Sequence, residues 1–266
     1  MAARLAALVL VLFGFSVNAQ VVPPMEKVLI PIFLFDTVPG AYGSVWKSEL
    51  VITNRSDQTV AIDGIFVRCN LGTCVPPPFL TLRERATVFA QPATPRAVPP
   101  GSFVLVEQAR LADVAFSLRI QDISRQALTW GTELPVIPEG QAFTRPIDFL
   151  NVPQDDRFRV LLRVYDYSPT TGHQIRITGY AIDPTVTEPP PNPGQLTPLF
   201  SIEQELVPSD APFLPGYAQI DLTQPMELPE NTRLLVHVEP LTPFTYWAFI
   251  NVTNNETQHV TVISPY

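Results

Sequence analysis

The chain has 266 residues, of which 30 are Pro and 12 are Gly, and its formal net charge is −8 at pH 7. This acidic balance argues against nucleic acid or an anionic membrane surface as a partner, because both require basic patches. Proline at this density excludes long helices, since an interior proline removes a helical hydrogen bond and clashes with the preceding turn. The composition therefore favours an all-β protein.

Residues 1–19 predict a secretory signal peptide. One basic residue, Arg4, precedes an apolar run from Leu5 to Phe15, and the small-residue sequence V-N-A follows at the end. The apolar run is shorter than the roughly 20 residues that span a bilayer, and the V-N-A exit approximates a signal cleavage site. We expect cleavage after Ala19 and an exported product, either periplasmic, secreted or attached to the cell surface. No transmembrane segment is expected after cleavage.

Short runs rich in Val, Ile, Thr and Phe alternate with turn residues up to about residue 140, which is typical of β-strands. The segment from Trp46 to Ile62 predicts a β-hairpin, because two alternating runs flank a polar turn at Asn54 to Gln58. Strands are expected at 28–35, 46–53, 60–68, 81–90, 102–107, 115–121 and 127–137. This number of regularly spaced short strands is typical of an immunoglobulin-like sandwich.

The remaining chain predicts a second set of strands, at 145–151, 159–167, 174–182, 199–207, 217–222, 233–239, 246–253 and 259–264. The two sets match each other in order. Residues 50–54 align with 162–166, and residues 104–128 align without a gap with 236–260. This pattern predicts a tandem duplication. We expect one domain at 20–140 and a second at 141–266, with a proline-rich internal loop near 185–198.

Two segments carry a resemblance to known families. The sequence L-V-I-T-N-R-S-D-Q-T-V-A-I, from Leu50, resembles the second and third strands of exported bacterial immunoglobulin-like domains. This resemblance implies two tandem antiparallel β-sandwich domains of seven to eight strands each. The sequence V-P-P-P-F-L-T-L, from Val75, is similar to the proline-rich fourth strand of two-domain periplasmic pilus chaperones. That similarity implies edge strands, such as 127–136, that pair with a partner strand.

Two cysteines, Cys69 and Cys74, lie in the sequence C-N-L-G-T-C. In an exported protein this spacing favours a disulfide that closes a small loop, with Gly72 allowing the chain to reverse. A metal site is the alternative, and it would need further ligands from elsewhere in the chain. The predicted disulfide rigidifies one loop and contributes little to the stability of the fold, because so short a loop loses little chain entropy.

The sequence contains no motif typical of an enzyme, so no catalytic, cofactor or metal residues are expected. The three histidines, His173, His237 and His259, lie in or beside predicted strands, and His237 is expected on a sheet face. The pair Asp155–Asp156 predicts a solvated turn, with a calcium site as the alternative.

Aromatic residues are the candidate binding groups. Trp46, Trp130 and Tyr246 are expected in the core, whereas Trp247 and Tyr167 are candidates for an exposed surface that binds a protein or a glycan. We therefore expect a non-enzymatic interaction, adhesion or surface-structural module. Two alternatives stay open: a carrier that binds subunits by β-strand addition, and a hydrolase in which His173 or His259 meets a carboxylate.

Overall fold

The computed structural model describes residues 23–34, 37–63, 68–70, 73–75, 78–90, 101–125, 130–168, 171–182, 197–209, 213–223 and 232–266. Regular structure in these ranges is antiparallel β-strand, apart from three short 3-10 helices, η1 (Ala41–Gly43), η2 (Gln108–Asp113) and η3 (Glu139–Gln141). The prediction of an all-β protein is confirmed. The same ranges contain no helix with the length and apolar character needed to cross a bilayer. The predicted signal peptide lies outside the described residues.

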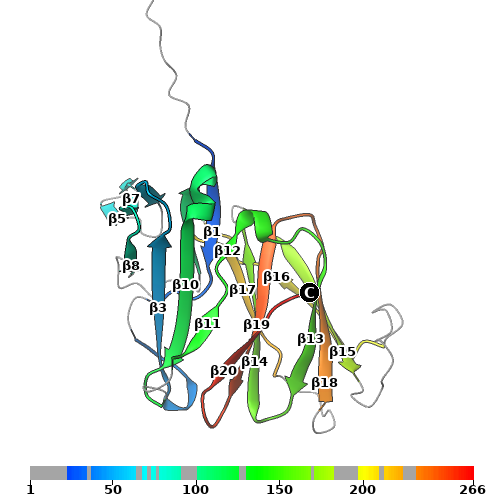
Figure 1. Cartoon of the computed structure of the whole chain (residues 1–266). Helices are drawn as coiled ribbons and strands as arrows, with labels where there is room; N and C mark the ends of the chain where they lie inside the picture. Colours follow the sequence, from blue (N-terminus) through cyan, green and yellow to red (C-terminus); the bar gives the residue numbers. More distant parts are fainter. Residues whose placement is uncertain are drawn as a thin grey trace, which may run out of the picture.

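Two sheets form one half of the molecule, called here the first sheet pair (Figure 1). Sheet 1 has the order β12-β1-β9-β4-β7, and sheet 2 has the order β11-β10-β3-β2, with β8 also paired to β3. A separate ribbon pairs β5 with β6. The strands are β1 Met25–Ile30, β2 Val38–Pro39, β3 Val45–Asn54, β4 Val60–Asp63, β5 Arg68–Asn70, β6 Thr73–Val75, β7 Pro78–Leu82, β8 Thr87–Ala90, β9 Ser102–Glu107, β10 Val114–Asp122, β11 Thr132–Leu134 and β12 Ile137–Pro138.

Two further sheets form the second sheet pair. Sheet 3 has the order β13-β18-β15-β16, and sheet 4 has the order β17-β14-β19-β20. The strands are β13 Ile147–Gln154, β14 Phe158–Asp166, β15 Gln174–Ile182, β16 Phe200–Glu205, β17 Gly216–Asp221, β18 Thr232–Pro240, β19 Tyr246–Asn254 and β20 Val260–Ile263.

Each sheet pair contains its own hydrophobic core, built from the side chains that alternate inward along its strands. Leu50 of sheet 2 and Ile62 of sheet 1 share the first core, and Leu162 of sheet 4 and Ile177 of sheet 3 share the second. All four side chains are fully buried. This alternation of buried and exposed positions explains why the strands could be located from the sequence.

The predicted hairpin at Trp46 to Ile62 is wrong. Its two strands are β3 and β4, which lie in different sheets of the first pair. β3 pairs with β10 along one edge and with β8 and β2 along the other, so no edge remains for β4. Asn54 ends β3 as a fully buried residue, and its Nδ2 donates to the carbonyl of Gln58 at 2.7 Å and to that of Arg83 at 2.9 Å. These bonds hold the bend that takes the chain from one sheet to the other.

Two other predicted strands each contain two shorter strands. The segment 81–90 is divided by a turn at Glu84 and Arg85, after which the chain passes from β7 in sheet 1 to β8 in sheet 2. Arg85 has a φ of 55°, a left-handed conformation that a continuous strand does not contain. The segment 127–137 contains β11 and β12, again in different sheets, while 126–129 lie outside the described residues. Trp130, expected in the core, is 76% exposed.

Sheet 4 packs against the first sheet pair with the face that points away from its own core. β19 shows this most clearly, because its residues from Tyr246 to Thr253 are all buried. Tyr246 and Ile250 belong to the second core, whereas Trp247 and Phe249 pack with the first. Trp247 stacks on Phe143 with ring centroids 5.1 Å apart. The strand is therefore apolar on both faces because it lies between two layers.

Two buried tyrosine hydroxyls connect the sheet pairs. The hydroxyl of Tyr165 donates to the carbonyl of Pro31 at 2.7 Å, and that of Tyr167 donates to the carbonyl of Ile137 at 2.8 Å. Gly101 passes over the ring of Tyr165, where a Cβ atom would lie 2.6 Å from a ring carbon, and it has a φ of +136°. A residue without a side chain is needed there for both reasons. These contacts join the two sheet pairs into a packed junction.

Candidate functional site

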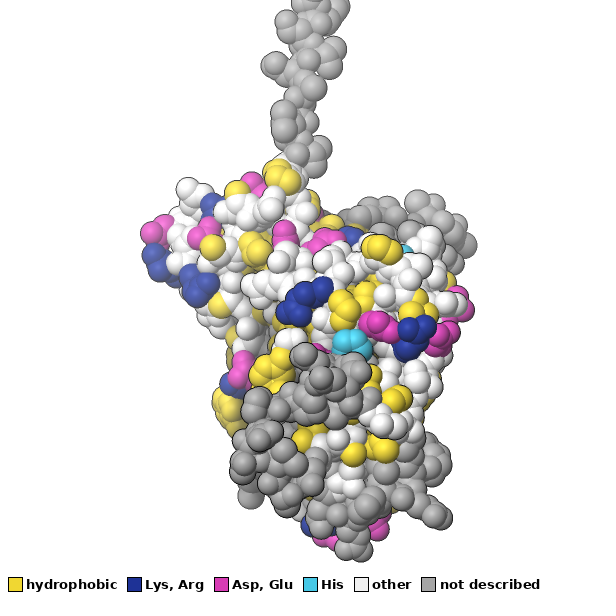
Figure 2. Space-filling model, turned by 90° about the vertical axis from the view of Figure 1, so that its right-hand side faces the viewer, with side chains coloured by type: hydrophobic (Ala, Val, Ile, Leu, Met, Phe, Trp, Pro, Cys, Tyr) yellow, Lys and Arg dark blue, Asp and Glu magenta, His cyan; other side chains and the backbone are white. Residues whose placement is uncertain are grey.

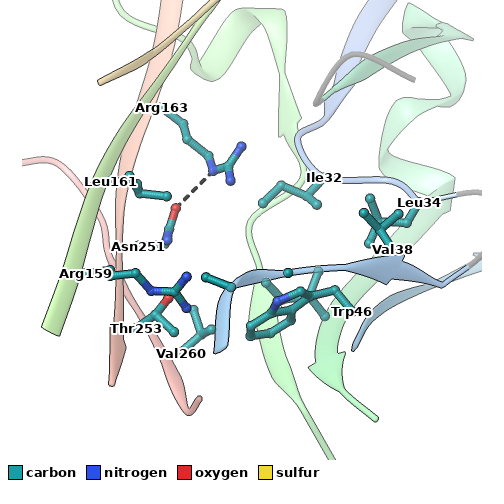
Figure 3. A pocket seen from close by; sticks show the side chains of 13 residues that line it. Ile32, Leu34, Val38, Trp46, Arg159, Leu161, Arg163, Asn251, Thr253 and Val260 are labelled. Carbon is teal, nitrogen blue, oxygen red and sulfur yellow. Dashed lines mark hydrogen bonds between the residues drawn. The ribbon is translucent and has the colours of Figure 1, made fainter. Parts of the chain in front are cut away.

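A cavity of about 240 Å³ lies where sheet 4 faces the first sheet pair (Figure 3). We call it the junction cavity. Its lining comes from segments more than a hundred residues apart in the chain: Ile32, Leu34, Val38, Gly40, Ala41, Trp46 and Ile120 from the first sheet pair, and Arg159, Leu161, Arg163, Asn251, Thr253 and Val260 from the second.

The polar wall of the junction cavity is built on β14 and β19. Arg159, Leu161 and Arg163 lie on one face of β14, because alternate residues of a strand share a face. In the antiparallel register, Leu161 lies opposite Asn251 and Arg159 lies opposite Thr253. The asparagine therefore lies between two arginines on the same surface of sheet 4. Figure 3 shows both guanidinium groups extending from this surface toward the first sheet pair.

Both arginines bind neutral groups of the protein. Arg163 donates from Nε to Oδ1 of Asn251 at 3.0 Å and from Nη1 to the hydroxyl of Tyr217 at 2.7 Å. Arg159 donates from Nη2 to Oε1 of Gln258 at 2.7 Å, and its guanidinium lies 5.3 Å from the ring centroid of Tyr42. The Nε atom of Arg159 is buried and has no hydrogen-bond partner among the described residues.

No described acidic residue forms an ion pair with Arg159 or Arg163. Burial raises the pKa of the Tyr217 phenol, although Arg163 opposes the shift, so this hydroxyl is neutral at pH 7 and does not offset the positive charge. By contrast, Arg176 on sheet 3 binds Glu203 at 2.9 Å and Glu239 at 2.7 Å. The junction cavity therefore carries local positive charge in an acidic protein.

The side of the molecule at the right of Figure 1, where β13, β15 and β18 lie, has a different character. Figure 2 shows acidic and basic side chains next to each other on this side, with a histidine among them. On sheet 3, Nδ1 of His237 lies 2.7 Å from Oδ1 of Asp148 on the neighbouring strand. The placement of His237 on a sheet face is consistent with the expectation, and Arg176 on the same sheet is paired with acidic side chains.

The two residues predicted as a binding surface, Trp247 and Tyr167, are buried. Trp247 is 8% exposed and Tyr167 is fully buried, both in the junction. The sequence reasoning considered only one face of each strand as buried, but sheet 4 is covered on both. Neither residue forms an exposed platform. Trp46 is half-buried and lines the junction cavity, whereas Tyr246 lies in the core as expected.

His173 does meet a carboxylate. Its Nδ1 lies 2.6 Å from Oδ2 of the fully buried Asp166, and its Nε2 lies 3.3 Å from the hydroxyl of Thr171. The imidazole also stacks on Phe244 with ring centroids 4.5 Å apart and 2° between the planes. These contacts close the turn between β14 and β15, and His173 does not line the junction cavity.

The carboxylate of Asp155 pairs with the side chain of Arg157. Its Oδ1 accepts hydrogen bonds from the backbone N–H and from Nε of Arg157, each at 3.0 Å, which is the turn geometry expected from the sequence. The described residues contain no group of three or more His, Cys, Asp or Glu side chains arranged to hold a metal ion.

Cys69 lies directly opposite Cys74 in the pairing of β5 with β6. This register concerns the backbone, and the predicted disulfide stays a prediction. The proline-rich run expected near 185–198 lies outside the described residues except at 197 and 198.

Sequence reasoning missed the junction cavity. The signal available was the run R-V-L-L-R-V-Y at 159–165, in which Leu161 and Tyr165 alternate with the core residues and so indicate that the second face of the strand is also buried. The run does not reveal which segment covers that face. Comparison of the chain with protein-family models, with curated proteins and with solved structures found no match.

Proposed function

We propose that this chain is an exported, non-enzymatic interaction module that uses the junction cavity as its binding site. The observation that carries the proposal is the cavity itself, which places two arginines of sheet 4 that have no ion pair with a described acidic residue opposite an apolar wall from the first sheet pair. Concave sites with an apolar lining and a few convergent polar groups are the usual form of ligand sites in proteins.

The packed junction supports binding by a preformed site. The tyrosine hydrogen bonds to Pro31 and Ile137 and the stacked Trp247 fix the two walls of the cavity relative to each other. A site whose walls are already in place loses less conformational entropy on binding. The described histidines do not line the cavity, and its lining consists of groups that hold a ligand by contact, hydrogen bonds and charge.

A screen of chemically diverse small molecules tests the proposal. Ligands of the junction cavity are expected to raise the melting temperature of the wild-type protein and to lose this effect in Leu161→Trp, whose indole would fill the cavity. Stabilisation by ligands that is equal in both proteins would contradict the site. A hydrolytic activity that is removed by His173→Ala would replace the proposal with the hydrolase alternative.

Export is tested separately by the mature N-terminus. In a bacterial host the exported protein is expected to begin at Gln20, as measured by intact mass. A full-length mass in the cytoplasmic fraction would contradict export.

The alternative is a carrier that binds a partner strand along the edge strand predicted at 127–136. The structure supports it less well than the cavity supports a ligand site. The described part of that segment, β11, is an edge strand of sheet 2 that lies beside β20, and the hydroxyl of Thr132 donates to the carbonyl of Val260 at 2.7 Å. Co-purification with a protein whose strand pairs with this edge would favour the carrier.

A further inference from the structure

The ligand class of the junction cavity can be inferred from the chemistry of its two walls. On one wall, Arg159 and Arg163 supply positive charge and Asn251 lies between them. A guanidinium group has its donors in a planar fork that matches a carboxylate. The Nε of Arg159 has no hydrogen-bond partner among the described residues, but protein atoms cover it, so a ligand would bind the terminal Nη groups of the two arginines instead. This wall therefore fits an anionic oxygen group.

The opposite wall is apolar. It comprises Ile32, Leu34, Val38 and Ile120, with the half-buried Trp46 beside them. Ile32, Leu34, Val38 and Trp46 face the arginines across the cavity in Figure 3. Burial of a hydrocarbon group against such a surface is favourable because it removes apolar area from water. A small inorganic anion would leave this wall without a partner. The two walls together fit a molecule with one acidic end and one apolar end.

The volume of the cavity indicates how large a group it can hold. The volume of about 240 Å³ corresponds to about eight molecules of liquid water at ~30 Å³ each. It is also below the ~300–1,000 Å³ typical of pockets for drug-sized ligands. A monocarboxylic acid with about eight non-hydrogen atoms, such as a medium-chain fatty acid or an arylacetic acid, has this size.

We propose that the junction cavity binds a small organic monocarboxylate, with the carboxylate held by Arg159 and Arg163 and the hydrocarbon body against the first sheet pair. The inference rests on the proposed function, because it names the ligand class of the same site. In this site the positively charged wall selects acids over neutral molecules of the same shape.

Isothermal titration calorimetry of the mature protein, with ligands matched in shape but different in charge, tests the proposal. Hexanoate and phenylacetate are the acids, hexanamide and phenylacetamide are the neutral counterparts, and hexylamine is the cation. The acids are expected to bind about 10- to 100-fold more tightly than the amides, which is the range of a charge-assisted hydrogen bond. The amine is expected not to bind. Equal binding of acids and amides would overturn the proposal.

Four variants assign the binding to the cavity. Arg163→Gln and Arg159→Gln are expected to weaken acid binding about 10- to 100-fold while leaving the weak amide binding unchanged. Arg163→Lys keeps the charge and is expected to retain part of the affinity. Arg176→Gln, on sheet 3, is the matched control and is expected to bind like wild type. Acid binding that survives both glutamine variants in folded protein would overturn the proposal.

The failure of this inference differs from failure of the proposed function. Suppose that neutral or cationic molecules bind to the wild-type protein but not to Leu161→Trp, and that acids do not bind. The cavity is then a ligand site, but not one for carboxylates. If no compound from the screen depends on the open cavity, both proposals fail.

Discussion

Asp122 shows how one buried side chain ends a strand in this fold. It is fully buried, and its Oδ1 accepts hydrogen bonds from the backbone N–H groups of Val45 at 2.9 Å and Ser124 at 3.0 Å and from the hydroxyl of Ser124 at 2.6 Å. Burial alone would raise the pKa of this carboxyl group. The hydrogen bonds, together with the positive charge of Arg125, outweigh burial and hold the pKa below its ordinary value.

This lowered pKa predicts a pH dependence of stability. A carboxyl group whose pKa is lower in the folded state stabilises the fold above its unfolded pKa of about 3.9, and this contribution is lost as the pH falls through the folded value. We expect the free energy of unfolding to decrease below about pH 4 in wild type, and to decrease less in Asp122→Asn. Urea titrations across this pH range measure the difference.

Asp57 provides the control for this experiment. A hydrogen bond from Arg85, at 2.7 Å, lowers the pKa of Asp57, but both side chains are exposed. Salt screens an exposed pair, so any effect of Asp57→Asn on the pH dependence should disappear at about 1 M salt, whereas the effect of Asp122→Asn should persist. An identical pH dependence in wild type and Asp122→Asn would contradict the assignment.

At the scale of elements, the same turn recurs where strands end. The last residues of four strands, Asn54 of β3, Asp122 of β10, Asp166 of β14 and Asn254 of β19, each accept a hydrogen bond at Oδ1 from the backbone N–H two residues later. Short carboxylate and amide side chains favour this geometry because they can replace a backbone acceptor in the turn. Each sheet pair therefore has two strands that end in this turn: β3 and β10 in the first pair, and β14 and β19 in the second.

Replacement of Asn54 tests how much such a turn contributes. Asn54→Ala removes the donor that the carbonyls of Gln58, Leu82 and Arg83 share, although Gln58 also accepts from the hydroxyl of Ser56 and Arg83 from the N–H of Ala86. We expect a loss of about 2–3 kcal/mol in the free energy of unfolding, measured by urea denaturation. Asp221→Ala, which removes an exposed turn of the same kind at Thr223, should cost about 0.5 kcal/mol or less. Equal losses would show that the buried carbonyls are satisfied without Asn54.

The cysteine ribbon gives a second prediction at this scale. Because Cys69 and Cys74 are opposite each other in β5 and β6, the oxidised protein is expected to be 2 Da lighter than the reduced one by intact mass, as one disulfide requires. The double variant with serine at both positions should lose at most about 2 kcal/mol, because the closed loop is short. An unchanged mass after reduction would contradict the disulfide.

The strands were predictable, but their partners were not. Leu50 and Ile52 share one face of the strand, and the polar residues Glu49 and Thr53 lie on the other, which identifies a strand and its buried face. This alternation does not say whether the next strand pairs in the same sheet, and so the hairpin at Trp46 was expected where the chain crosses between sheets. The junction cavity has the same origin: Ile32 and Arg159 meet only because sheet 4 packs on the first pair, and no local pattern encodes that contact.

At the scale of the whole molecule, the two sheet pairs have the same strand order. Sheet 1 reads β1-β9-β4-β7 beyond β12, and sheet 3 reads β13-β18-β15-β16. Sheet 2 reads β11-β10-β3-β8, with the short strand β2 as an addition on the same edge of β3, and sheet 4 reads β20-β19-β14-β17. The successive strands of one pair therefore occupy the places of the successive strands of the other. The tandem duplication predicted from residues 50–54 and 162–166 requires this correspondence, and we propose the duplication as the origin of the two sheet pairs.

The junction between the sheet pairs predicts that they unfold together. Two packed units move independently unless the interface between them is large and apolar, and here Trp247, Phe249 and Tyr165 are buried in it. We expect a single calorimetric transition for wild type, with a van't Hoff enthalpy equal to the calorimetric enthalpy. Trp247→Ala should separate this transition into two, because it removes the ring stacked on Phe143. Val236→Ala, inside the second core, is the control. It should lower the melting temperature, and its transition should stay single or split less than the transition of Trp247→Ala. Two transitions already present in wild type would contradict a cooperative junction and would remove the preformed walls that the junction cavity requires.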